Sequence, residues 1–488
     1  MTAQRQLTVV EALLPLLVLV GLLIAGALTI GMTGEMLVAV ILAAAAAAGV
    51  IAARHGVTWA DIQSSTGDKI AAVLPALLIL LSIGMLIATW VLSGTIPWLV
   101  FQGVRLVRPE FLIVTAFLAT AVMSLCTGTS WGSAGTIGVA LMGMAAALDA
   151  PLAATAGAVV SGAYFGDKLS PLSDSTNICA IGADAPLYSH IRHMLYTALP
   201  SFLIALLVYT MAARLTPFAG DGLPDSARLL LADLDAVFTL HWIVLLPPAV
   251  VIWSIMRNTP PALAITLSSL VAAAIGVVVQ GFGVQDAVSA AIAGFRIEMV
   301  AAAGAESEAL SPAFATLVQR GGLYSMATTL IVVISAFLLA GAMDAAGALD
   351  LLIRRMLAAV RSVFGLITAT MAAGATMIAL TSHGGVTALV IGGLFQQAYR
   401  ERGLDTVNLS RSLEDGVTIT EPLMPWTVSA VFMATTLGVP TIAYAPWAVF
   451  CYGGPIFSLL IAGTYRYTRF GIREATRVDR HESAPASC

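Results

Sequence analysis

Long stretches without a charged residue dominate the chain. Runs free of Asp, Glu, Lys and Arg cover residues 12–34, 36–53, 70–104, 111–148, 150–166, 194–213, 236–256, 258–285, 321–343, 362–399 and 422–465. A helix needs about 20 apolar residues to cross the hydrocarbon core of a bilayer. The pattern therefore predicts an all-α polytopic membrane protein with about ten transmembrane helices.

Two of these runs, 111–148 and 362–399, are each 38 residues long and too long for one helix. Small and hydroxyl residues interrupt each run near its middle, Cys126–Gly132 in the first and Thr381–Gly385 in the second. Non-helical backbone at membrane depth is tolerated only where it is buried in protein or lines a wet cavity. Each run is therefore predicted to form a re-entrant hairpin.

Basic residues indicate the orientation of the chain. They precede and follow run 362–399, and five more arginines lie within 466–488. Cytoplasmic segments carry an excess of Lys and Arg, so both ends of this hairpin and both chain termini are predicted to be cytoplasmic. The same rule places the acidic linker 214–235 outside. Arg105 and Arg108 depart from the rule, and segment 94–108 is therefore expected to be an external surface segment. The expected location is the cell inner membrane.

The two halves of the chain match at an offset of about 251 residues. Span 70–92 corresponds to 321–343, the hairpins correspond to each other, and Ser170-Pro171 corresponds to Glu421-Pro422. Partners cross in opposite senses, which predicts the inverted repeat of secondary transporters. The predicted parts are a first repeat 1–213 (hairpin 111–148, broken helix 150–183), an external linker 214–235, a second repeat 236–465 (hairpin 362–399, broken helix 406–437) and a cytoplasmic tail 466–488.

Composition excludes most other classes of protein. Hydrophobic residues make up 59% of the chain and charged residues 10%, whereas a soluble domain carries about 25% charged residues. The net charge of −4 leaves no basic stripe for nucleic acid. The four cysteines show no metal-ligand spacing. We expect no resident cofactor and no nucleic-acid partner.

The run GAYFGDKLSPLSDSTN at 162–177 places ionisable residues inside an apolar segment. Pro171 removes a backbone donor and frees carbonyls, and intramembrane carboxylates are functional by default. Carbonyls, hydroxyls, an amide and a carboxylate are the hard oxygen ligands that Na⁺ requires. Candidate ion-binding residues are Asp167, Ser173, Asp174 and Asn177, with Asp174 and Asn177 expected to bind Na⁺ directly. Lys168 is expected to pair with Asp167 or Asp174.

The corresponding run in the second half, LEDGVTITEPLMPW at 413–426, again places carboxylates and hydroxyls before a double-proline break. The candidates are Asp415, Thr418 and Glu421. For Glu414 and Asp415 an alternative stays open, namely a capped helix start beside Arg411 at the cytoplasmic surface.

These motifs, together with TGTSWG at 127–132 and NLSRSLEDGVTITEPLMPW at 408–426, resemble the NhaC family of Na⁺/H⁺ antiporters. The resemblance covers nearly the whole chain and implies Na⁺/H⁺ exchange by an elevator-type carrier, often a homodimer. The resemblance alternatively implies the activity of some relatives, which exchange organic anions such as malate for lactate. Carried onto this chain, the motif points to Asp167, Asp174 and Asn177, with Thr129 and Ser130 at the facing hairpin tip.

The second tip departs from the family pattern. It reads Thr381-Ser382-His383-Gly384-Gly385 where relatives carry an acidic stretch, and Glu421 stands where they carry a small residue. Thr381 and Ser382 are candidates there, and this half-site is open to a ligand other than Na⁺. The alternative function is therefore Na⁺- or H⁺-coupled exchange of small organic acids or amino acids.

Two further hypotheses concern individual side chains. Gly128-Thr129-Ser130-Trp131-Gly132 fits the nucleophile pattern GxSxG, and His383 is a candidate base for an intramembrane serine hydrolase, but the strand-to-helix context is lacking. His190 and His193 are expected at the membrane interface. The expectation is that the protein is not an enzyme.

Asp174 carries the sharpest expectation. It follows Pro171 by three residues and precedes three side chains with neutral oxygens. Partial burial there is expected to let Na⁺ and H⁺ compete for its carboxylate. On this basis Asp174→Asn is expected to abolish exchange and Glu414→Gln to have a mild effect.

Overall fold

The computed structural model describes residues 7–29, 33–215, 223–257, 259–304 and 306–475. In chain order, the first helices are α1 (Val9–Thr29), α2 (Gly34–Arg54), α3 (Trp59–Leu92), α4 (Thr95–Leu106), η1 (Pro109–Phe111), α5 (Leu112–Thr127), α6 (Ser130–Ser133), η2 (Ala134–Gly138), α7 (Val139–Ala147), α8 (Leu152–Leu169), α9 (Asp174–Ala183) and α10 (Leu187–Leu215).

The next helices are α11 (Asp225–Val237), η3 (Trp242–Leu245), α12 (Leu246–Met256), α13 (Pro261–Val278), α14 (Val284–Ala293), η4 (Ile297–Ala303), η5 (Ser307–Ala309), α15 (Pro312–Val318), η6 (Leu323–Met326), α16 (Ala327–Ala345) and α17 (Ala348–Ala358). The last helices are α18 (Val363–Thr381), α19 (Gly384–Glu401), α20 (Thr406–Leu413), η7 (Glu414–Thr418), η8 (Glu421–Leu423), α21 (Val428–Leu437), α22 (Thr441–Tyr444), η9 (Ala445–Trp447) and α23 (Val449–Thr468).

Among the described residues, eight helices are long and apolar enough to cross a membrane, or up to ten if each of two bent helix pairs counts as one span. The only extended pairing in this part of the chain is an isolated antiparallel bridge between Leu404 and Glu474. The prediction of an all-α polytopic membrane protein is therefore confirmed.

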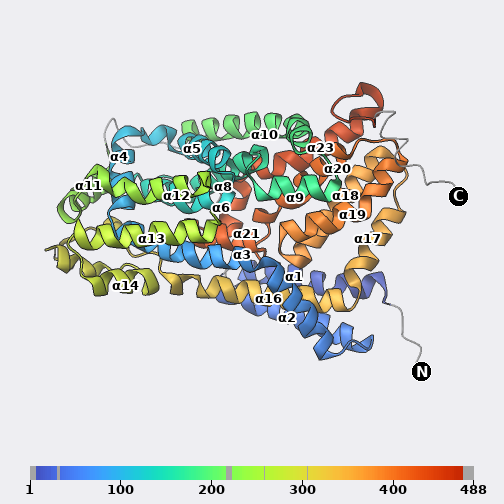
Figure 1. The fold of residues 1–488 in the computed structure, drawn as a ribbon, viewed down its shortest axis with the longest axis horizontal. Helices are drawn as coiled ribbons and strands as arrows, with labels where there is room; N and C mark the ends of the chain where they lie inside the picture. Colours follow the sequence, from blue (N-terminus) through green and yellow to red (C-terminus); the bar gives the residue numbers. More distant parts are fainter. Residues whose placement is uncertain (1–6, 30–32, 216–222, 258, 305, 476–488) are drawn as a thin grey trace.

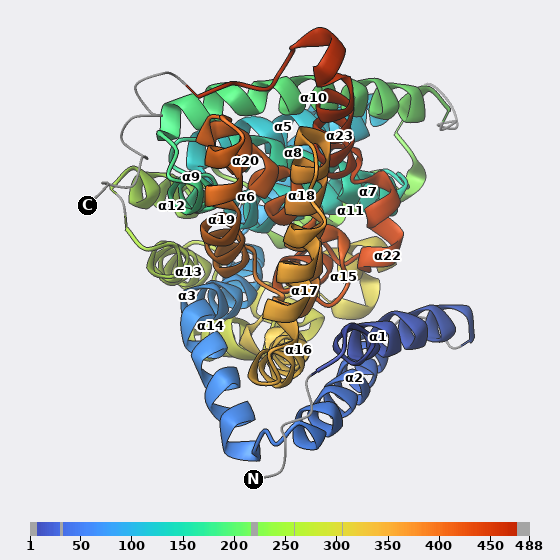
Figure 2. The ribbon, with the colours of Figure 1, turned by 90° about the vertical axis from the view of Figure 1, so that its right-hand side faces the viewer.

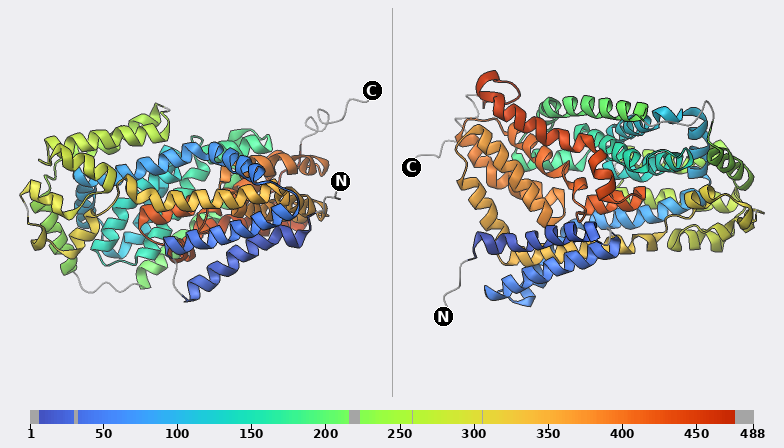
Figure 3. Two further views of the ribbon diagram at one scale, coloured as in Figure 1. Left: turned by 90° about the horizontal axis from the view of Figure 1, so that it is seen from below. Right: turned by 180° about the vertical axis from the view of Figure 1, so that it is seen from behind.

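Most of the long helices run along the longest axis of the molecule (Figure 1). Seen along this axis, α10 and α23 lie on one side and α1, α2 and α16 on the opposite side (Figure 2). Within these groups, α23 lies beside α10 and α16 lies beside α2, as the other views also show (Figure 3). The broken segments α8–α9 and α20–α21 lie between these two groups, in the interior of the molecule.

The region of 70–108 differs in detail from the expectation. Helix α3 begins at Trp59, where Thr58 and Asp61 form a capping box, and continues to Leu92. Gly94, in the left-handed conformation, then turns the chain into α4. The expected surface segment is a helix with one buried face, because Ile96, Val100 and Val104 pack into the core.

Both predicted hairpin tips are breaks with the same backbone conformation. Gly128 ends α5 at φ 69° and Ser382 ends α18 at φ 59°, both left-handed. The next residues, Thr129 and His383, are extended, at φ −145° and −141° with ψ 122° in each case. The interruptions of both runs are therefore confirmed, and their depth in a membrane stays a prediction.

The side chains around the two tips also repeat. The Thr127 and Ser133 hydroxyls lie 3.3 Å apart, and those of Thr381 and Thr387 lie 2.7 Å apart. The Ser133 hydroxyl donates to the Thr129 carbonyl and the Thr387 hydroxyl to the His383 carbonyl. Thr381 stands 254 positions after Thr127, and Thr387 stands 254 positions after Ser133.

The same spacing of 254 continues through the broken helices. Ser173 caps α9 as Thr427 caps α21, each accepting a hydrogen bond from the amide three residues on. Helices α9 and α21 then end at residues in the left-handed conformation, Asp184 and Gly438. This register pairs Pro171 with Pro425 and corrects the offset of 251 for this region. Its main consequence is that Asp167 and Glu421 occupy equivalent positions.

Each tip packs against the broken helix of the other half. Trp131 of the first tip stacks on Phe432 of α21, with ring centroids 4.5 Å apart and planes 9° apart. In the second half, α19 contacts α9 so closely that a Cβ on Gly392 would lie 2.3 Å from the Gly182 carbonyl oxygen. Glycine at both positions permits this backbone approach. The two halves are thereby interlocked around one centre.

Candidate functional site

Asp167 lies at the end of α8, where the helix breaks. Its side chain is 8% exposed. Ser130 Oγ donates to Asp167 Oδ2 at 2.9 Å, and Ser173 Oγ donates to Oδ1 at 2.6 Å. Three sequence-predicted residues, one from the first tip and two from the break, are therefore brought together. This carboxylate is held by two hydroxyl groups and by no cationic side chain among the described residues.

The carbonyls freed by the break are satisfied locally. Thr176 Oγ1 donates to the Asp167 and Lys168 carbonyls at 3.0 and 3.1 Å. Asn177 Nδ2 donates to the Pro171 and Ser173 carbonyls at 3.1 and 2.7 Å. The carbonyls that the sequence offered as Na⁺ ligands are therefore bonded to side chains of α9, and Asn177 supports the backbone of the break.

Glu421 occupies the equivalent position in the second half and is 7% exposed. Its carboxylate interacts with Ser429 and with the backbone amide of Gly384, the first residue of α19. The tip is closely fitted here, because a Cβ on Gly384 would lie 2.7 Å from Glu421 Oε2. The Glu421 and Asp167 carboxylates interact electrostatically with each other and with Tyr164. The buried Tyr164 side chain also interacts with Ser429.

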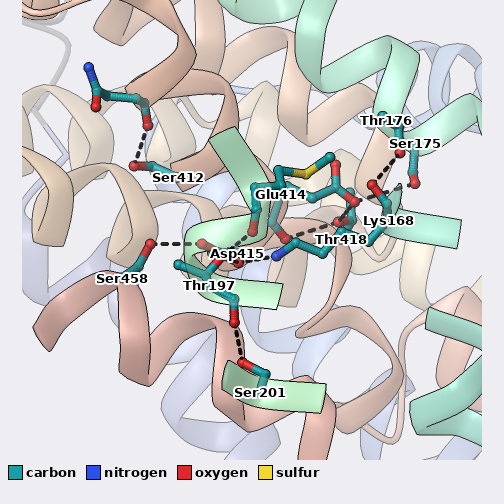
Figure 4. Close-up of polar contacts among 12 residues, drawn as sticks. Lys168, Ser175, Thr176, Thr197, Ser201, Ser412, Glu414, Asp415, Thr418 and Ser458 are labelled. Atoms are coloured by element: carbon teal, nitrogen blue, oxygen red, sulfur yellow. Dashed lines mark hydrogen bonds and ion pairs between the residues drawn. The ribbon is translucent and has the colours of Figure 1, made fainter. Parts of the chain in front are cut away.

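Lys168 pairs with Asp415 of the second half, and both side chains are fully buried. Thr197 Oγ1 of α10 donates to Asp415 Oδ1 at 3.3 Å, and Ser458 Oγ of α23 donates to Oδ2 at 2.7 Å (Figure 4). The expected pairing of Lys168 with Asp167 or Asp174 is wrong, because the Lys168 side chain crosses to the other half. Sequence reasoning also missed Thr197 and Ser458, which lie in otherwise ordinary spans.

Glu414 and Asp415 lie in the buried π-helix η7. A π-turn adds a residue to the helical turn, and such turns are frequent at functional sites. Thr418 Oγ1 donates to Glu414 Oε1 at 2.6 Å, and Ser175 Oγ lies 3.5 Å from the same oxygen (Figure 4). Glu414 Oε2 is buried without a partner in the described part of the chain. The alternative of a capped helix start at the surface is therefore wrong.

Asp174 differs from the expectation. Its side chain is exposed, and it has no hydrogen-bond or ion-pair partner among the described residues. As the first residue of α9 it follows the cap Ser173, which directs it out of the helix start. The partial burial on which its assignment depended is absent, whereas Asp167, six residues before Ser173, has that burial.

The remaining predicted residues lie at the tips. Thr129 Oγ1 accepts from the Gly132 amide and so caps α6. Thr381 bonds to Thr387, and the buried Ser382 hydroxyl has no partner among the described residues. Ser130 donates to Asp167 rather than to a histidine, so this contact gives no support to the hydrolase hypothesis.

Two broken helices that bring buried carboxylates together between their breaks define a class of protein, because secondary transporters build their sites in this way. Comparison with known proteins identifies the family. Residues 162–464 match the model of the Na⁺/H⁺ antiporter family. The chain belongs to this family.

Individual relatives cover almost the same length. An uncharacterised Na⁺/H⁺ antiporter of Haemophilus influenzae is 41% identical over 93% of this chain and 96% of its own. The Na⁺/H⁺ antiporter NhaC of Alkalihalophilus pseudofirmus is 35% identical, over 83% and 85%. The malate-2H⁺/Na⁺-lactate antiporter of Bacillus subtilis is 31% identical, over 81% and 82%. These relatives are transporters and not enzymes.

Proposed function

We propose that this chain is a secondary active transporter that exchanges Na⁺ for H⁺, with Asp167 and Glu421 as the groups for which the two ions compete. The observation that carries the proposal is their equivalence: both are buried, both stand at a helix break, and each faces one tip. A carboxylate that binds either a proton or Na⁺, but not both, is the smallest device that couples the two fluxes.

The charge around these groups favours a cation. Four buried carboxylates, Asp167, Glu414, Asp415 and Glu421, are accompanied by only two buried basic side chains of the described residues that interact with them, Lys168 and Arg411. Burying an unpaired carboxylate costs several kcal/mol, so a proton or a metal cation stabilises this arrangement. Asp167, Ser130, Ser173, Glu421 and Tyr164 offer hard oxygen ligands, the kind that Na⁺ prefers.

The decisive comparison uses two aspartates on either side of one helix break. Asp167→Asn is expected to abolish Na⁺-dependent pH changes in proteoliposomes, because the competing carboxylate is gone. Asp174→Asn removes the same charge from an exposed position and is expected to leave exchange unchanged. Loss of exchange in Asp174→Asn, with retention in Asp167→Asn, would reverse the assignment.

We also infer an elevator-type movement in which the tips and broken helices carry the ion past α2, α3 and α16. The interlocked packing of the two halves supports this, because Trp131 on Phe432 and Gly182 on Gly392 make one unit of the parts that bind the ion. Because arginines are concentrated on one side of the predicted topology, the proposal includes cytoplasmic positions for both termini. It also includes a homodimer in the inner membrane.

Exchange of small organic acids or amino acids is the second candidate, and the name of the Bacillus subtilis relative favours it. Binding of a carboxylate by the helix N-terminus at the second tip would meet an obstacle, because Glu421 already occupies the N-terminus of α19. Uptake of radiolabelled malate, lactate or amino acids by the same vesicles separates this function from Na⁺/H⁺ exchange. Uptake without any Na⁺-dependent pH change would replace the first proposal with the second.

A further inference from the structure

Arg411, on α20, is fully buried. Its Nη1 donates to the Gly471 carbonyl oxygen. Its Nε and Nη2 have no hydrogen-bond partner among the described residues. No carboxylate oxygen of the described residues lies within 4.0 Å of the guanidinium, and the Asp415 side chain, one turn further on, is already bound by Lys168, Thr197 and Ser458.

Such an environment is costly for a group that stays charged in proteins. A buried ion is tolerated when its partners satisfy both its charge and its hydrogen bonds, and here two donors are left over. Nearly all buried polar groups in native proteins have a partner, whether protein, water or ligand. The structure therefore leaves two buried donors of Arg411 open to an acceptor that is not part of the described chain.

The two free donors form one edge of the guanidinium. Nε–H and one Nη2–H point the same way in one plane, and this edge matches the two oxygens of a carboxylate. A chloride ion can lie between the two donors but accepts both hydrogen bonds at bent angles, whereas a carboxylate offers one oxygen to each donor. Neutral water leaves the charge unpaired. The free edge therefore selects a carboxylate.

Further unpartnered nitrogens lie on the adjoining face of α10. His193 interacts electrostatically with Arg411 and with Asn408 of α20. His193 Nε2 and both ring nitrogens of His190 are buried without partners among the described residues. Both histidines lie near the start of α10 and are buried in the protein, at 6% and 0% exposed, and their position relative to the membrane interface stays a prediction. Five unsatisfied nitrogen atoms are thus shared between one face of α10 and one of α20.

We propose that Arg411, assisted by His193, binds the carboxylate group of a small organic acid. Arg411 Nε and Nη2 each donate a hydrogen bond to one carboxylate oxygen. His193 Nε2 donates a further hydrogen bond when that nitrogen carries the proton. The site uses neither Asp167 nor Glu421, so it goes beyond Na⁺/H⁺ exchange and is tested separately from it.

The test measures thermal unfolding of the purified full-length chain in detergent with sodium acetate, sodium L-lactate, sodium L-malate or sodium chloride. Sodium concentration and ionic strength are kept equal, so that Na⁺ binding contributes the same in every sample. We expect at least one carboxylate to raise the unfolding temperature above that in chloride, in a concentration-dependent way. Equal unfolding temperatures in all four salts would overturn the proposal.

Variants locate the effect. Arg411→Lys keeps the charge but loses the two-pronged edge, and we expect it to weaken carboxylate binding by about tenfold or more. Arg402→Gln is the control, because the Arg402 side chain, like that of Arg411, donates to backbone carbonyls but is partly exposed, and its carboxylate response should equal that of the wild type. A wild-type response in Arg411→Lys would overturn the assignment. Should Arg411→Lys fail to fold, His193→Gln gives the same comparison.

The result is independent of Na⁺/H⁺ exchange measured in vesicles. A chain that exchanges Na⁺ for H⁺ but shows no carboxylate response refutes the Arg411 site alone. A chain with the carboxylate response but without Na⁺-dependent pH changes refutes the proposed exchange alone. Uptake of the labelled carboxylate then shows whether the bound acid is also transported.

Discussion

Lys168 is the buried basic residue that pairs directly with a carboxylate of the site. It is fully buried, and its ammonium group pairs with Asp415 across the boundary between the two halves. Removing one member of a buried pair leaves the other charge without compensation, which costs about 3–5 kcal/mol. The pair is therefore a structural connection between the halves as well as part of the electrostatic field of the site.

Lys168→Met is accordingly expected to lower the free energy of unfolding by about 3–5 kcal/mol, measured by chemical unfolding in detergent. The double variant Lys168→Met with Asp415→Asn should recover a large part of this loss, because no unpaired charge remains. A double variant as unstable as the single one would show that the ion pair is not the cause.

At the scale of single residues, the sequence predicts which residue types form the site better than it predicts the surroundings of each side chain. Asp167, Ser130 and Glu421 are found from ionisable and hydroxyl groups in apolar runs, and all three lie at the centre. Asp174 fails because a single cap, Ser173, decides which of two nearby aspartates faces inward. Partners such as Thr197 are beyond sequence reasoning, since a hydroxyl in an ordinary span has no distinguishing pattern.

At the scale of elements, the second tip is built around the contact between α19 and Glu421. Gly384, the first residue of α19, has no side chain, and its amide is free to interact with the carboxylate. Backbone amides at a helix N-terminus favour a negative charge. The equivalent residue in the first half is Ser130, which serves Asp167 through its hydroxyl group instead.

Gly384→Ala is expected to reduce Na⁺/H⁺ exchange by about tenfold or more, because the new Cβ displaces Glu421 and weakens a charged hydrogen bond. Gly393→Ala is the control in the same helix, where an added Cβ meets no atom within 4 Å. Vesicle assays of both variants provide the measurement. Equal exchange in the two variants would contradict the role given to this contact.

The breaks, the helices and most of their bounds follow from the sequence, since glycine, hydroxyl and proline clusters mark where long apolar runs end. The register between the halves does not follow as reliably. Matching Pro171 to Pro422 gave an offset of 251, whereas the caps Ser173 and Thr427 give 254. Two prolines close together in the second half allow either alignment, and only the backbone conformation distinguishes them.

At the scale of the whole molecule, the proposed elevator mechanism makes the boundary between α16 and α21 one at which two parts would move past each other. The Thr329 and Thr435 hydroxyls lie 2.8 Å apart across it. A cavity of about 310 Å³ adjoins this contact, lined in part by Thr33, Leu37 and Thr435.

Cysteines at positions 329 and 435 are therefore expected to block exchange when they are bridged by oxidation or by mercury, and a reductant or thiol should restore it. The wild-type chain, treated in the same way, controls for its own cysteines, of which Cys126 is exposed. Vesicle exchange before and after bridging is the measurement. Full activity in the bridged protein would exclude movement at this boundary.

The equivalence of Asp167 and Glu421 stops at the next residue, where Lys168 is matched by Pro422. Two carboxylates are thus available for protons, and a basic side chain follows only the first of them in the sequence. If one Na⁺ exchanges for two protons, one net charge crosses the membrane in each cycle, and every 100 mV of membrane voltage adds about 2.3 kcal/mol to the driving force. The membrane potential alone would then drive exchange by this carrier, even when the pH is equal on both sides.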